Sequence, residues 1–318
     1  MHKNLKSLSI VLPCHNEEDV ILDSYNKIID IINPMLGEYI SCYEFVIVNN
    51  GSTDASIQEM LKIVSIDENV FICDLRRNFG YQGSITAGLY HASKDMVISM
   101  DADLQDDPTK ILDMIKEHYK GFDLVLGVRS NRKSDSIIKR MFANIFYFLT
   151  QKINKETIPH HGDFRLMSKE LVEDFKLFKE RNRYLRGMIL SLDSQYSVVE
   201  YSRQPRIKGK TKFNVIQLFE LAIDGITSFS ITPVRFITLF GILMLFVSIF
   251  FITYILIQKL YFGVTVEGWA FTAIAICMFG GINSFFIGIV GEYVGKSYVE
   301  AKERPLFTVR KFISQKDL

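Results

Sequence analysis

Residues 96–108 read Met-Val-Ile-Ser-Met-Asp-Ala-Asp-Leu-Gln-Asp-Asp-Pro, a short apolar run that leads directly into two carboxylates. Asp101 and Asp103 therefore stand at the carboxyl end of a predicted β-strand, one residue apart. Carboxylates at this spacing can share a hard divalent cation, because Mg²⁺ and Mn²⁺ prefer oxygen ligands from one or two carboxylates and from phosphates. A cation held there would neutralise the charge that grows on a diphosphate leaving group. The stretch thus predicts a metal site at a strand end.

The sequence on both sides of this stretch alternates between β-rich runs and helical patterns. The predicted strands cover residues 7–12, 45–48, 70–74, 96–100 and 124–128, and the predicted helices cover residues 17–32, 55–65, 81–92 and 108–119. Such alternation is typical of an α/β fold, with a parallel sheet and helices on both of its faces. Ligands bind to these sheets beyond the carboxyl ends of the strands, so the functional residues are expected there.

Three other predicted strands also end in polar residues. They run into Pro13-Cys-His-Asn-Glu17, Asn49-Asn-Gly-Ser-Thr-Asp54 and Arg76-Arg-Asn-Phe-Gly80. Any one of these stretches could be a turn with a helix cap, since Ser, Asp and Asn cap helices routinely. Caps alone do not explain four polar strand ends in one sheet, so together they predict a ligand site.

Composition and charge exclude several other classes of protein. Lys and Arg total 37 and Asp and Glu total 36, so no basic field argues for nucleic acid. The four cysteines lie far apart without C-x-x-C spacing, which indicates buried thiols rather than a zinc site or a disulfide framework. The polar N-terminus leads straight into a strand-like run and does not resemble a signal peptide.

Two long apolar stretches lie near the C-terminus, at residues 234–257 and 269–290. Each is long enough to cross a bilayer, which takes about 20 residues in a helix. The short connection holds only Lys259, whereas six basic residues follow the second stretch. By the positive-inside rule, this asymmetry predicts a two-helix transmembrane hairpin with both ends in the cytoplasm. The alternative is a pair of long buried helices in a soluble core.

Basic and amphipathic segments lie between the sheet and these apolar stretches. Arg129, Arg132, Lys139 and Arg140 follow the last predicted strand, and a second cluster occupies residues 206–212. Arginine suits phosphate because its planar fork donates two hydrogen bonds at once. A basic patch attracted to anionic lipids is the alternative for the second cluster. Apolar residues at helical spacing in 137–149 and 215–226 predict helices that lie in the membrane surface or in the catalytic core.

Several motifs together resemble those of glycosyltransferase family 2. They are Val-Asn-Asn-Gly-Ser-Thr-Asp-Ala-Ser at 48–56, Arg-Asn-Phe-Gly at 77–80, Asp-Ala-Asp-Leu-Gln at 101–105 and Asp-Phe-Arg-Leu-Met at 163–167. The likeness is to the polyprenyl-phosphate subgroup, which includes dolichol-phosphate mannose synthases and bactoprenol glucosyltransferases. It extends to Gly-Glu-Tyr-Val-Gly at 291–295, after the second apolar stretch. The resemblance implies a GT-A version of the Rossmann-like sheet and a metal-dependent, inverting transfer.

The resemblance and the hydropathy pattern divide the chain into four expected parts. Residues 1–212 form a cytoplasmic GT-A catalytic domain, and residues 213–233 form an amphipathic interface helix. Residues 234–295 form two transmembrane helices, and residues 296–318 form a cytoplasmic basic tail. The expected location is the inner (cytoplasmic) membrane, as a multi-pass protein whose catalytic domain faces the cytoplasm. Tetramers packed through membrane segments occur in the family, so a homo-oligomer is a further expectation.

The resemblance also implies roles for individual residues of the donor site. The nucleotide sugar would be bound by Pro13, His15, Asn16, Glu17, Asn50, Ser52, Asp101, Arg206 and Lys212. The metal, Mg²⁺ or Mn²⁺, would be held by Asp101, Asp103 and Gln105. Two positions depart from the family pattern: His15 stands where an aromatic residue is usual, and Asn50 stands where aspartate is usual.

On the acceptor side, the resemblance places Arg129 and Arg140 on the phosphate of the lipid. Asp103 and Asp163 are the expected catalytic residues, with Asp163 near the transferred sugar. A lipid phosphate is already an anion near neutral pH, so its attack needs positioning and charge compensation more than a general base.

The expected reaction is transfer of a hexose, glucose from UDP-glucose, to undecaprenyl phosphate, giving a polyprenyl-phosphate sugar for modification of cell-envelope glycans. UDP-N-acetylhexosamine and GDP-mannose are the alternative donors. A non-catalytic protein that binds nucleotide sugars is an alternative of another class, which Asn49-Asn50 favours and Asp101, Asp103 and Asp163 oppose. A processive polysaccharide synthase is disfavoured, since its Gln-x-x-Arg-Trp motif is missing and the single tryptophan, Trp269, lies in an apolar stretch.

Overall fold

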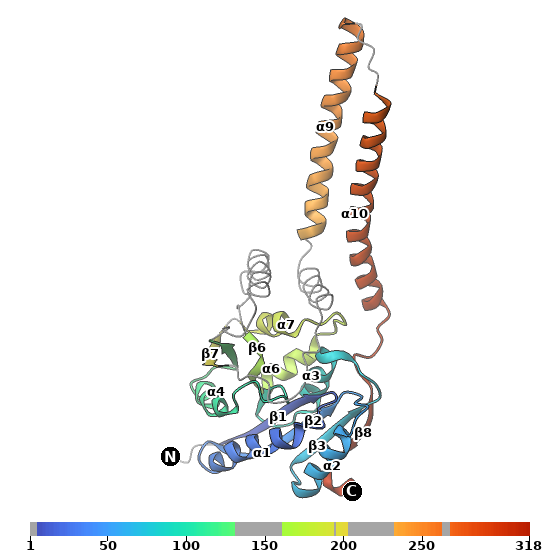
Figure 1. Cartoon of the computed structure of the whole chain (residues 1–318). Helices are drawn as coiled ribbons and strands as arrows, with labels where there is room; N and C mark the ends of the chain where they lie inside the picture. Colours follow the sequence, from blue (N-terminus) through green and yellow to red (C-terminus); the bar gives the residue numbers. More distant parts are fainter. Residues whose placement is uncertain (1–4, 131–160, 194, 203–231, 263–267) are drawn as a thin grey trace. The chain divides into compact units, whose positions relative to one another are not determined.

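The computed structural model describes residues 5–130, 161–193, 195–202, 232–262 and 268–318 (Figure 1). The chain forms two compact units. The first comprises Met1–Glu220 together with Pro305–Leu318, and the second comprises Leu221–Arg304. Arg140, Arg206, Lys212 and the two predicted amphipathic segments lie outside the described residues.

The first unit is built on one eight-stranded sheet, with strand order β7-β5-β6-β4-β1-β2-β3-β8. The five predicted strands are present as β1 (Lys6–Cys14), β2 (Ile40–Asn49), β3 (Val70–Leu75), β4 (Met96–Ser99) and β5 (Leu124–Arg129). The predicted helices are present as α1 (Ile21–Ile32), α2 (Ser56–Ile66), α3 (Gly80–His91) and α4 (Ile111–Tyr119), with short 3-10 turns at Asn33–Met35 and Pro108–Lys110. The α/β alternation that the sequence predicts is therefore confirmed.

The five predicted strands run in one direction, as expected of a parallel sheet, but further strands make the sheet mixed. Strand β6 (His161–Ser168) lies between β4 and β5 and pairs antiparallel with both. Strand β7 (Tyr196–Tyr201) extends the sheet parallel to β5. Strand β6 has no apolar pattern, because this wholly buried strand contains His161, Asp163 and Arg165 among its apolar residues.

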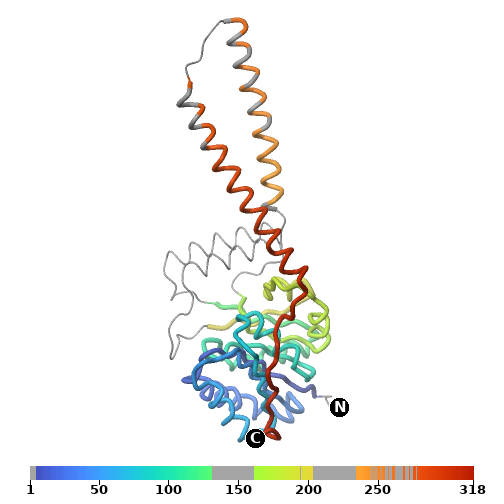
Figure 2. The backbone as a smooth tube through the Cα atoms, turned by 90° about the vertical axis from the view of Figure 1, so that its right-hand side faces the viewer, coloured from blue at the N-terminus to red at the C-terminus, as the bar shows by residue number. Residues whose placement is uncertain are grey.

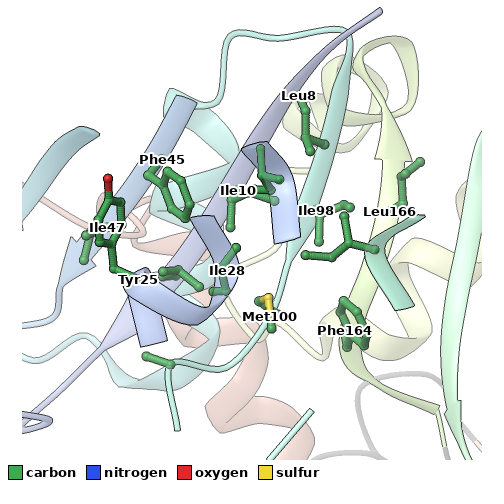
Figure 3. Close-up of a cluster of buried hydrophobic side chains, with 14 of the residues drawn as sticks. Leu8, Ile10, Tyr25, Ile28, Phe45, Ile47, Ile98, Met100, Phe164 and Leu166 are labelled. Carbon is green, nitrogen blue, oxygen red and sulfur yellow. The ribbon is translucent and has the colours of Figure 1, made fainter. Parts of the chain in front are cut away.

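Both faces of the sheet are covered by helices. On one face, Leu8, Ile10 and Leu12 of β1 pack with residues of α1, α2 and α4, in the cluster that Figure 3 shows in part. On the other face, Val11 packs with residues of α3, α6 (Lys169–Leu177) and α7 (Leu185–Leu192). Successive side chains of a strand point to opposite faces, so an uninterrupted apolar strand such as β1 feeds two cores at once.

The second unit consists of two long helices, α9 (Thr232–Phe262) and α10 (Trp269–Ala301). Within α9, the window Val234–Phe251 is long and apolar enough to cross a membrane, with none of it buried. It is the one helical window of the described residues that meets this test. The second predicted span, residues 269–290, lies within α10 and stays a prediction, as does the hairpin arrangement.

The C-terminal segment contains a strand that the sequence analysis missed. Strand β8 (Val309–Ile313) pairs antiparallel with β3 and forms one edge of the sheet, as the red end of the tube beside the blue strands in Figure 2 illustrates. Phe312 stacks on Phe71, with ring centroids 5.8 Å apart, and Arg310 forms an ion pair with Asp74 at 3.5 Å. The sequence of this strand, Val-Arg-Lys-Phe-Ile, contains two charged residues and so shows no clear apolar pattern, as is common for strands at sheet edges.

We expect removal of β8 to destabilise the first unit. Truncation after Leu306 removes the hydrogen bonds to β3 and the Phe312–Phe71 stack. Each hydrogen bond lost lowers the free energy of unfolding by a net amount of about 1 kcal/mol. A total loss of about 2 kcal/mol lowers the midpoint of thermal unfolding by roughly 4–8 °C in a domain of this size. Circular dichroism of the purified chain in detergent measures this midpoint. Truncation after Ile313 is the control, and equal midpoints for both truncations would contradict a structural role of β8.

Candidate active site

The mixed topology brings residues from four strands to one edge of the sheet. Asp101 follows the carboxyl end of β4, Arg129 ends β5, and Tyr201 ends β7. Strand β6 runs in the opposite direction, so its amino-terminal half carries Asp163 to the same edge. The Ser99 hydroxyl donates a 2.7 Å hydrogen bond to the Asp163 carbonyl and ties β4 to β6 at this point.

On the β1–β2 side, the structure brings the predicted nucleoside-binding residues together. The Asn16 amide donates to the Ser52 hydroxyl at 3.1 Å, and the Asn16 side chain accepts from the Thr53 amide at 2.8 Å. The Glu17 amide donates to the Ser56 hydroxyl at 2.8 Å. Pro13 lies in β1 opposite Val48 of β2. The loops after β1 and β2 thus form one hydrogen-bonded surface.

Gly51 lets the loop after β2 approach the loop after β3 closely. Its φ angle is +62°, in the left-handed region that favours glycine. A Cβ atom at this position would stand 2.5 Å from the backbone of both Arg77 and Asn78. Contact between the two loops therefore requires glycine here, for its backbone conformation and for its lack of a side chain.

Asn50 is buried and uses its amide group to hold the loop after β3. Its Nδ2 donates to Asn78 Oδ1 and to the Gly80 carbonyl, both at 3.1 Å, and its Oδ1 accepts from the Phe79 amide at 2.8 Å. His15 Nδ1 lies 3.0 Å from the Asn50 carbonyl, and His15 Nε2 lies 3.1 Å from Asn78 Nδ2. Because a carbonyl can only accept, Nδ1 carries the hydrogen and Nε2 accepts from Asn78.

Asp101 stands among other acidic groups. Burial, followed by the charges of Asp106, Asp103 and Asp163, raises the pKa of Asp101 to about 7, although a hydrogen bond from the Tyr81 hydroxyl opposes the rise. That bond is 2.5 Å long. Like charges repel, so this corner of the site favours binding of a cation.

The donor atoms at this corner fit Mg²⁺ or Mn²⁺. The carboxylates of Asp101 and Asp103 and the side-chain amide of Gln105 are hard oxygen ligands, and the Gln105 backbone amide donates to Asp103 Oδ1 at 3.1 Å. Within the part of the chain that the structure describes, no group of three or more His, Cys, Asp or Glu residues could enclose a metal ion. Mg²⁺ can be held by one or two carboxylates together with waters and substrate phosphates, so Asp101 and Asp103 would be enough protein ligands.

Asp163 is buried between two arginines. One carboxylate oxygen pairs with Arg165 and the other accepts from Arg186 Nη2 at 2.9 Å. Burial alone would raise the pKa of Asp163, but the charges of Arg186 and Arg165 outweigh it and hold the pKa well below its usual range. Asp163 is therefore a carboxylate with both oxygens engaged, at 3% exposure.

Arg129 is held beside the acidic corner by two partners. Its Nε donates to the Tyr201 hydroxyl at 3.1 Å, and its Nη2 lies 3.6 Å from Asp106. Tyr201 in turn donates to Asp106 at 2.5 Å. Burial opposes the charge of Arg129, but Tyr201 and Asp106 outweigh it and raise the pKa of the guanidinium. A Cβ at Gly162 would stand 3.1 Å from Arg129 Nη2, so this glycine leaves room for the guanidinium.

Sequence reasoning missed several residues that build the site. Asp106 lies within residues 101–108 and Arg165 lies in the motif that begins at Asp163. Both could have been proposed as site residues because they are close in sequence to predicted ones. Tyr81, Arg186 and Tyr201 come from elements distant in the sequence, and no local pattern marks them. Each is placed by the topology of β4, β6 and β7 and of the helices packed on them.

Comparison with known proteins identifies the family. The model of "Glycosyl transferase family 2" matches residues 9–175. The chain is 37% identical to a prophage bactoprenol glucosyl transferase homolog of Escherichia coli, covering 96% of this chain and 98% of that protein. It is 38% identical to the bactoprenol glucosyl transferase of Shigella phage SfII, over 96% and 97% of the two chains.

A further relative is an uncharacterized glycosyltransferase of Bacillus subtilis, YkcC, at 37% identity over 95% of this chain and 93% of that one. Among solved structures, glucosyl-3-phosphoglycerate synthase from Mycobacterium tuberculosis with UDP matches at 17% identity and a TM-score of 0.45, covering 70% of this chain and 79% of that one. This identity and TM-score are too low to support a family assignment. The assignment rests on the family model and on the relatives of nearly equal length. The chain belongs to glycosyltransferase family 2.

Proposed function

We propose that this protein transfers glucose from UDP-glucose to undecaprenyl phosphate, with inversion at the sugar carbon. The observation that carries the proposal is the meeting of a carboxylate corner, Asp101 and Asp103, with the guanidinium of Arg129 at one sheet edge. The first suits the metal-bound diphosphate of a donor, and the second suits an acceptor that is itself a phosphate. The choice of acceptor and sugar is supported by relatives that are named bactoprenol glucosyl transferases and that match this chain along nearly their whole length.

On the donor side, Asp101, Asp103 and Gln105 would hold Mg²⁺ or Mn²⁺, which would neutralise charge on the departing diphosphate when bound. The hydrogen bond from Tyr81 orients the Asp101 carboxylate. The loops that carry His15, Asn16 and Ser52 are joined by hydrogen bonds and offer one surface for the nucleoside. Arg206 and Lys212, outside the described residues, are proposed to close over the diphosphate.

On the acceptor side, Arg129 and Arg140 are proposed to bind the lipid phosphate. Both reactants are anions, so holding them in line requires fixed cations. Arg129 meets this need because Tyr201 and Asp106 fix its guanidinium before any substrate arrives. The phosphate attacks as an anion, so a strong general base is not required.

The membrane arrangement is part of the proposal. Helix α9 would form the first span of a two-helix hairpin and α10 the second, with the catalytic domain of residues 1–212 on the cytoplasmic side. The apolar window Val234–Phe251 and the basic residues after residue 290 support this arrangement. The protein would then be a multi-pass protein of the cytoplasmic membrane, where its lipid substrate is embedded.

The proposed reaction is tested directly with labelled donors. Membranes that contain the protein and undecaprenyl phosphate are incubated with radiolabelled UDP-glucose, UDP-N-acetylglucosamine or GDP-mannose. We expect label from UDP-glucose in the lipid fraction. If only another donor labels the lipid fraction, the transferred sugar in the proposal is the sugar of that donor and not glucose. Binding of nucleotide sugar without transfer from any donor would support the non-catalytic alternative.

Substitution of Asp103 tests the metal-dependent mechanism. We expect Asp103→Asn to lower the transfer rate by at least about 100-fold, the scale for loss of a main contact to transition-state charge. Asp107→Asn is the matched control, because Asp107 caps the following 3-10 turn and asparagine caps equally well. Wild-type transfer that persists in excess chelator would overturn the mechanism.

The proposed hairpin predicts which positions can be labelled from outside the cell. A cysteine at Gly263, in the connection between the spans, should react with a membrane-impermeant thiol reagent in intact cells. The control cysteine at Lys302, after the second span, should react only once the membrane is opened. The same accessibility at both positions would contradict the arrangement.

The division into donor and acceptor halves predicts the kinetics of arginine variants. Arg140→Ala should leave UDP affinity nearly unchanged, as measured by isothermal titration, but weaken use of the lipid phosphate. Loss of a phosphate contact reduces transition-state stabilisation by about 1.5–3 kcal/mol, which raises KM for the lipid or lowers kcat. Arg140→Lys should retain only part of the activity that Arg140→Ala loses, because the lysine ammonium cannot make two parallel hydrogen bonds. Loss of UDP binding with normal lipid kinetics would move Arg140 to the donor half.

A further inference from the structure

The C-terminal segment enters the sheet next to a loop of the donor site. Pro305–Leu318 belong to the first unit, although they follow closely on α10 of the second. Strand β8 runs antiparallel to β3, so the beginning of β8 lies beside the carboxyl end of β3. The loop of residues 76–80 starts at that end. The proposed mechanism gives the C-terminal segment no part, yet it borders this loop.

Arg310 is the extra residue of a β-bulge in β8. Asp74 of β3 lies opposite Lys311, whereas the next residue, Leu75, lies opposite Val309. The register therefore shifts at Arg310. A bulge changes the direction of a side chain relative to the regular ladder, and bulges are frequent next to active sites. The direction of Arg310 is thus a specific feature of this edge strand.

Both backbone polar groups of Arg76, the first residue after β3, are bound by the C-terminal segment. The Arg76 amide donates to the Thr308 carbonyl at 3.0 Å, and the Arg76 carbonyl accepts from Arg310 Nη2 at 3.1 Å. The backbone of residues 77–78 follows directly, and a Cβ atom at Gly51 would stand 2.5 Å from it. The C-terminal segment therefore fixes the chain just before the loops after β2 and β3 meet.

Arg310 is also connected to the loop after β2, through two buried side chains. Its Nη1 lies 3.5 Å from Oδ2 of Asp74, and Oδ1 of Asp74 accepts from Asn49 Nδ2 at 2.8 Å. Asn49 Oδ1 in turn accepts from the Ser52 amide at 3.1 Å. A carboxylate only accepts and an N–H only donates, so these two partners fix the orientation of the Asn49 amide. Ser52 is one of the residues expected to bind the nucleotide sugar.

The ion pair of Arg310 is too exposed to contribute much to stability. The Arg310 side chain is 59% exposed, and ion pairs with a solvent-exposed partner contribute little to the free energy of unfolding. The hydrogen bonds of β8 to β3 and the Phe312–Phe71 stack hold the strand in place without it. We therefore expect the contacts of Arg310 to matter for the geometry of the two loops more than for folding.

We propose that Arg310 is a positioning residue of the donor site, which holds the loops after β2 and β3 in the arrangement that receives the nucleoside. It acts on the first loop through Asp74 and Asn49, which hold the Ser52 amide. It acts on the second loop through the carbonyl of Arg76. The inference rests on the proposed function and makes donor binding depend on the strand that follows the apolar helices.

Substitution of Arg310 in the full chain tests the proposal. We expect Arg310→Ala to weaken UDP binding, measured by isothermal titration, by about 3- to 10-fold, the range for one net hydrogen bond. Its thermal midpoint and its KM for the lipid phosphate should stay close to those of the wild type. Arg310→Lys should retain part of the affinity, since an ammonium can pair with Asp74 but lacks the planar fork that also meets the Arg76 carbonyl.

Lys311→Ala is the matched control. Lys311 is the next residue of β8, is also exposed, and carries the same charge as Arg310. Its loss should leave UDP affinity unchanged. An equal loss of affinity in Lys311→Ala and Arg310→Ala would overturn the proposal, because it would reflect the net charge of the edge strand. Unchanged UDP affinity in Arg310→Ala would overturn it as well.

A double-mutant cycle tests the connection through Asp74. Asp74→Asn removes the ion pair but keeps an oxygen that can accept from Asn49. If Arg310 acts through Asp74, the double variant should bind UDP no more weakly than Arg310→Ala alone. Losses that multiply would contradict this connection. Should Asp74→Asn fail to fold, as judged by its thermal midpoint, the comparison of Arg310→Ala with Lys311→Ala decides the question.

The titration also separates this proposal from the proposed function. A wild type that binds UDP but transfers no glucose would overturn the proposed reaction, while the Arg310 variants would still report on the donor site. Normal transfer by the wild type, combined with unchanged UDP affinity in Arg310→Ala, would overturn the role of Arg310 and leave the proposed function intact.

Discussion

The buried contact of Asp163 with Arg165 and Arg186 is the interaction on which the site depends. It requires β6 to run antiparallel between β4 and β5, because only then does the amino-terminal half of β6 reach the edge where the parallel strands end. Burial of these charged groups is tolerated because each carboxylate oxygen meets a guanidinium. Beside this carboxylate, Gly162 has no side chain, which leaves room for the guanidinium of Arg129.

The charge distribution at this edge divides into two regions. Burial, followed by the charges of Asp106, Asp103 and Asp163, raises the pKa of Asp101, so one region of this edge is acidic. On β6, Asp163 is paired with two cations, Arg165 and Arg186. In the proposed transfer between two phosphate-bearing molecules, the acidic region would serve a metal-bound diphosphate and Arg129 would serve the other anion. The Tyr201–Asp106–Arg129 contacts tie Arg129 to the acidic corner through hydrogen bonds to a shared tyrosine.

The sequence predicted those parts of this molecule whose signal is local. Apolar runs marked β1 to β5, and the carboxylates after β4 could be assigned a chemistry because strand ends of one direction share an edge. Strand β6 could not be found in this way, since its buried charges satisfy one another only in three dimensions. The same limit applies to Arg186 and Tyr201, which reach the site from α7 and β7. Strand β8 was missed because an edge strand needs few apolar residues.

The departures of His15 and Asn50 from the family pattern explain each other. The Asn50 amide donates to two acceptors, Asn78 Oδ1 and the Gly80 carbonyl, and an aspartate at this position would place a charged oxygen against both. Asn78 then has its own amide free to donate to His15 Nε2 at 3.1 Å, which suits a neutral imidazole with its hydrogen on Nδ1. Since Asn50 is buried and committed to this loop, we propose that a bound base would contact groups nearer the surface, among them His15, which the network orients.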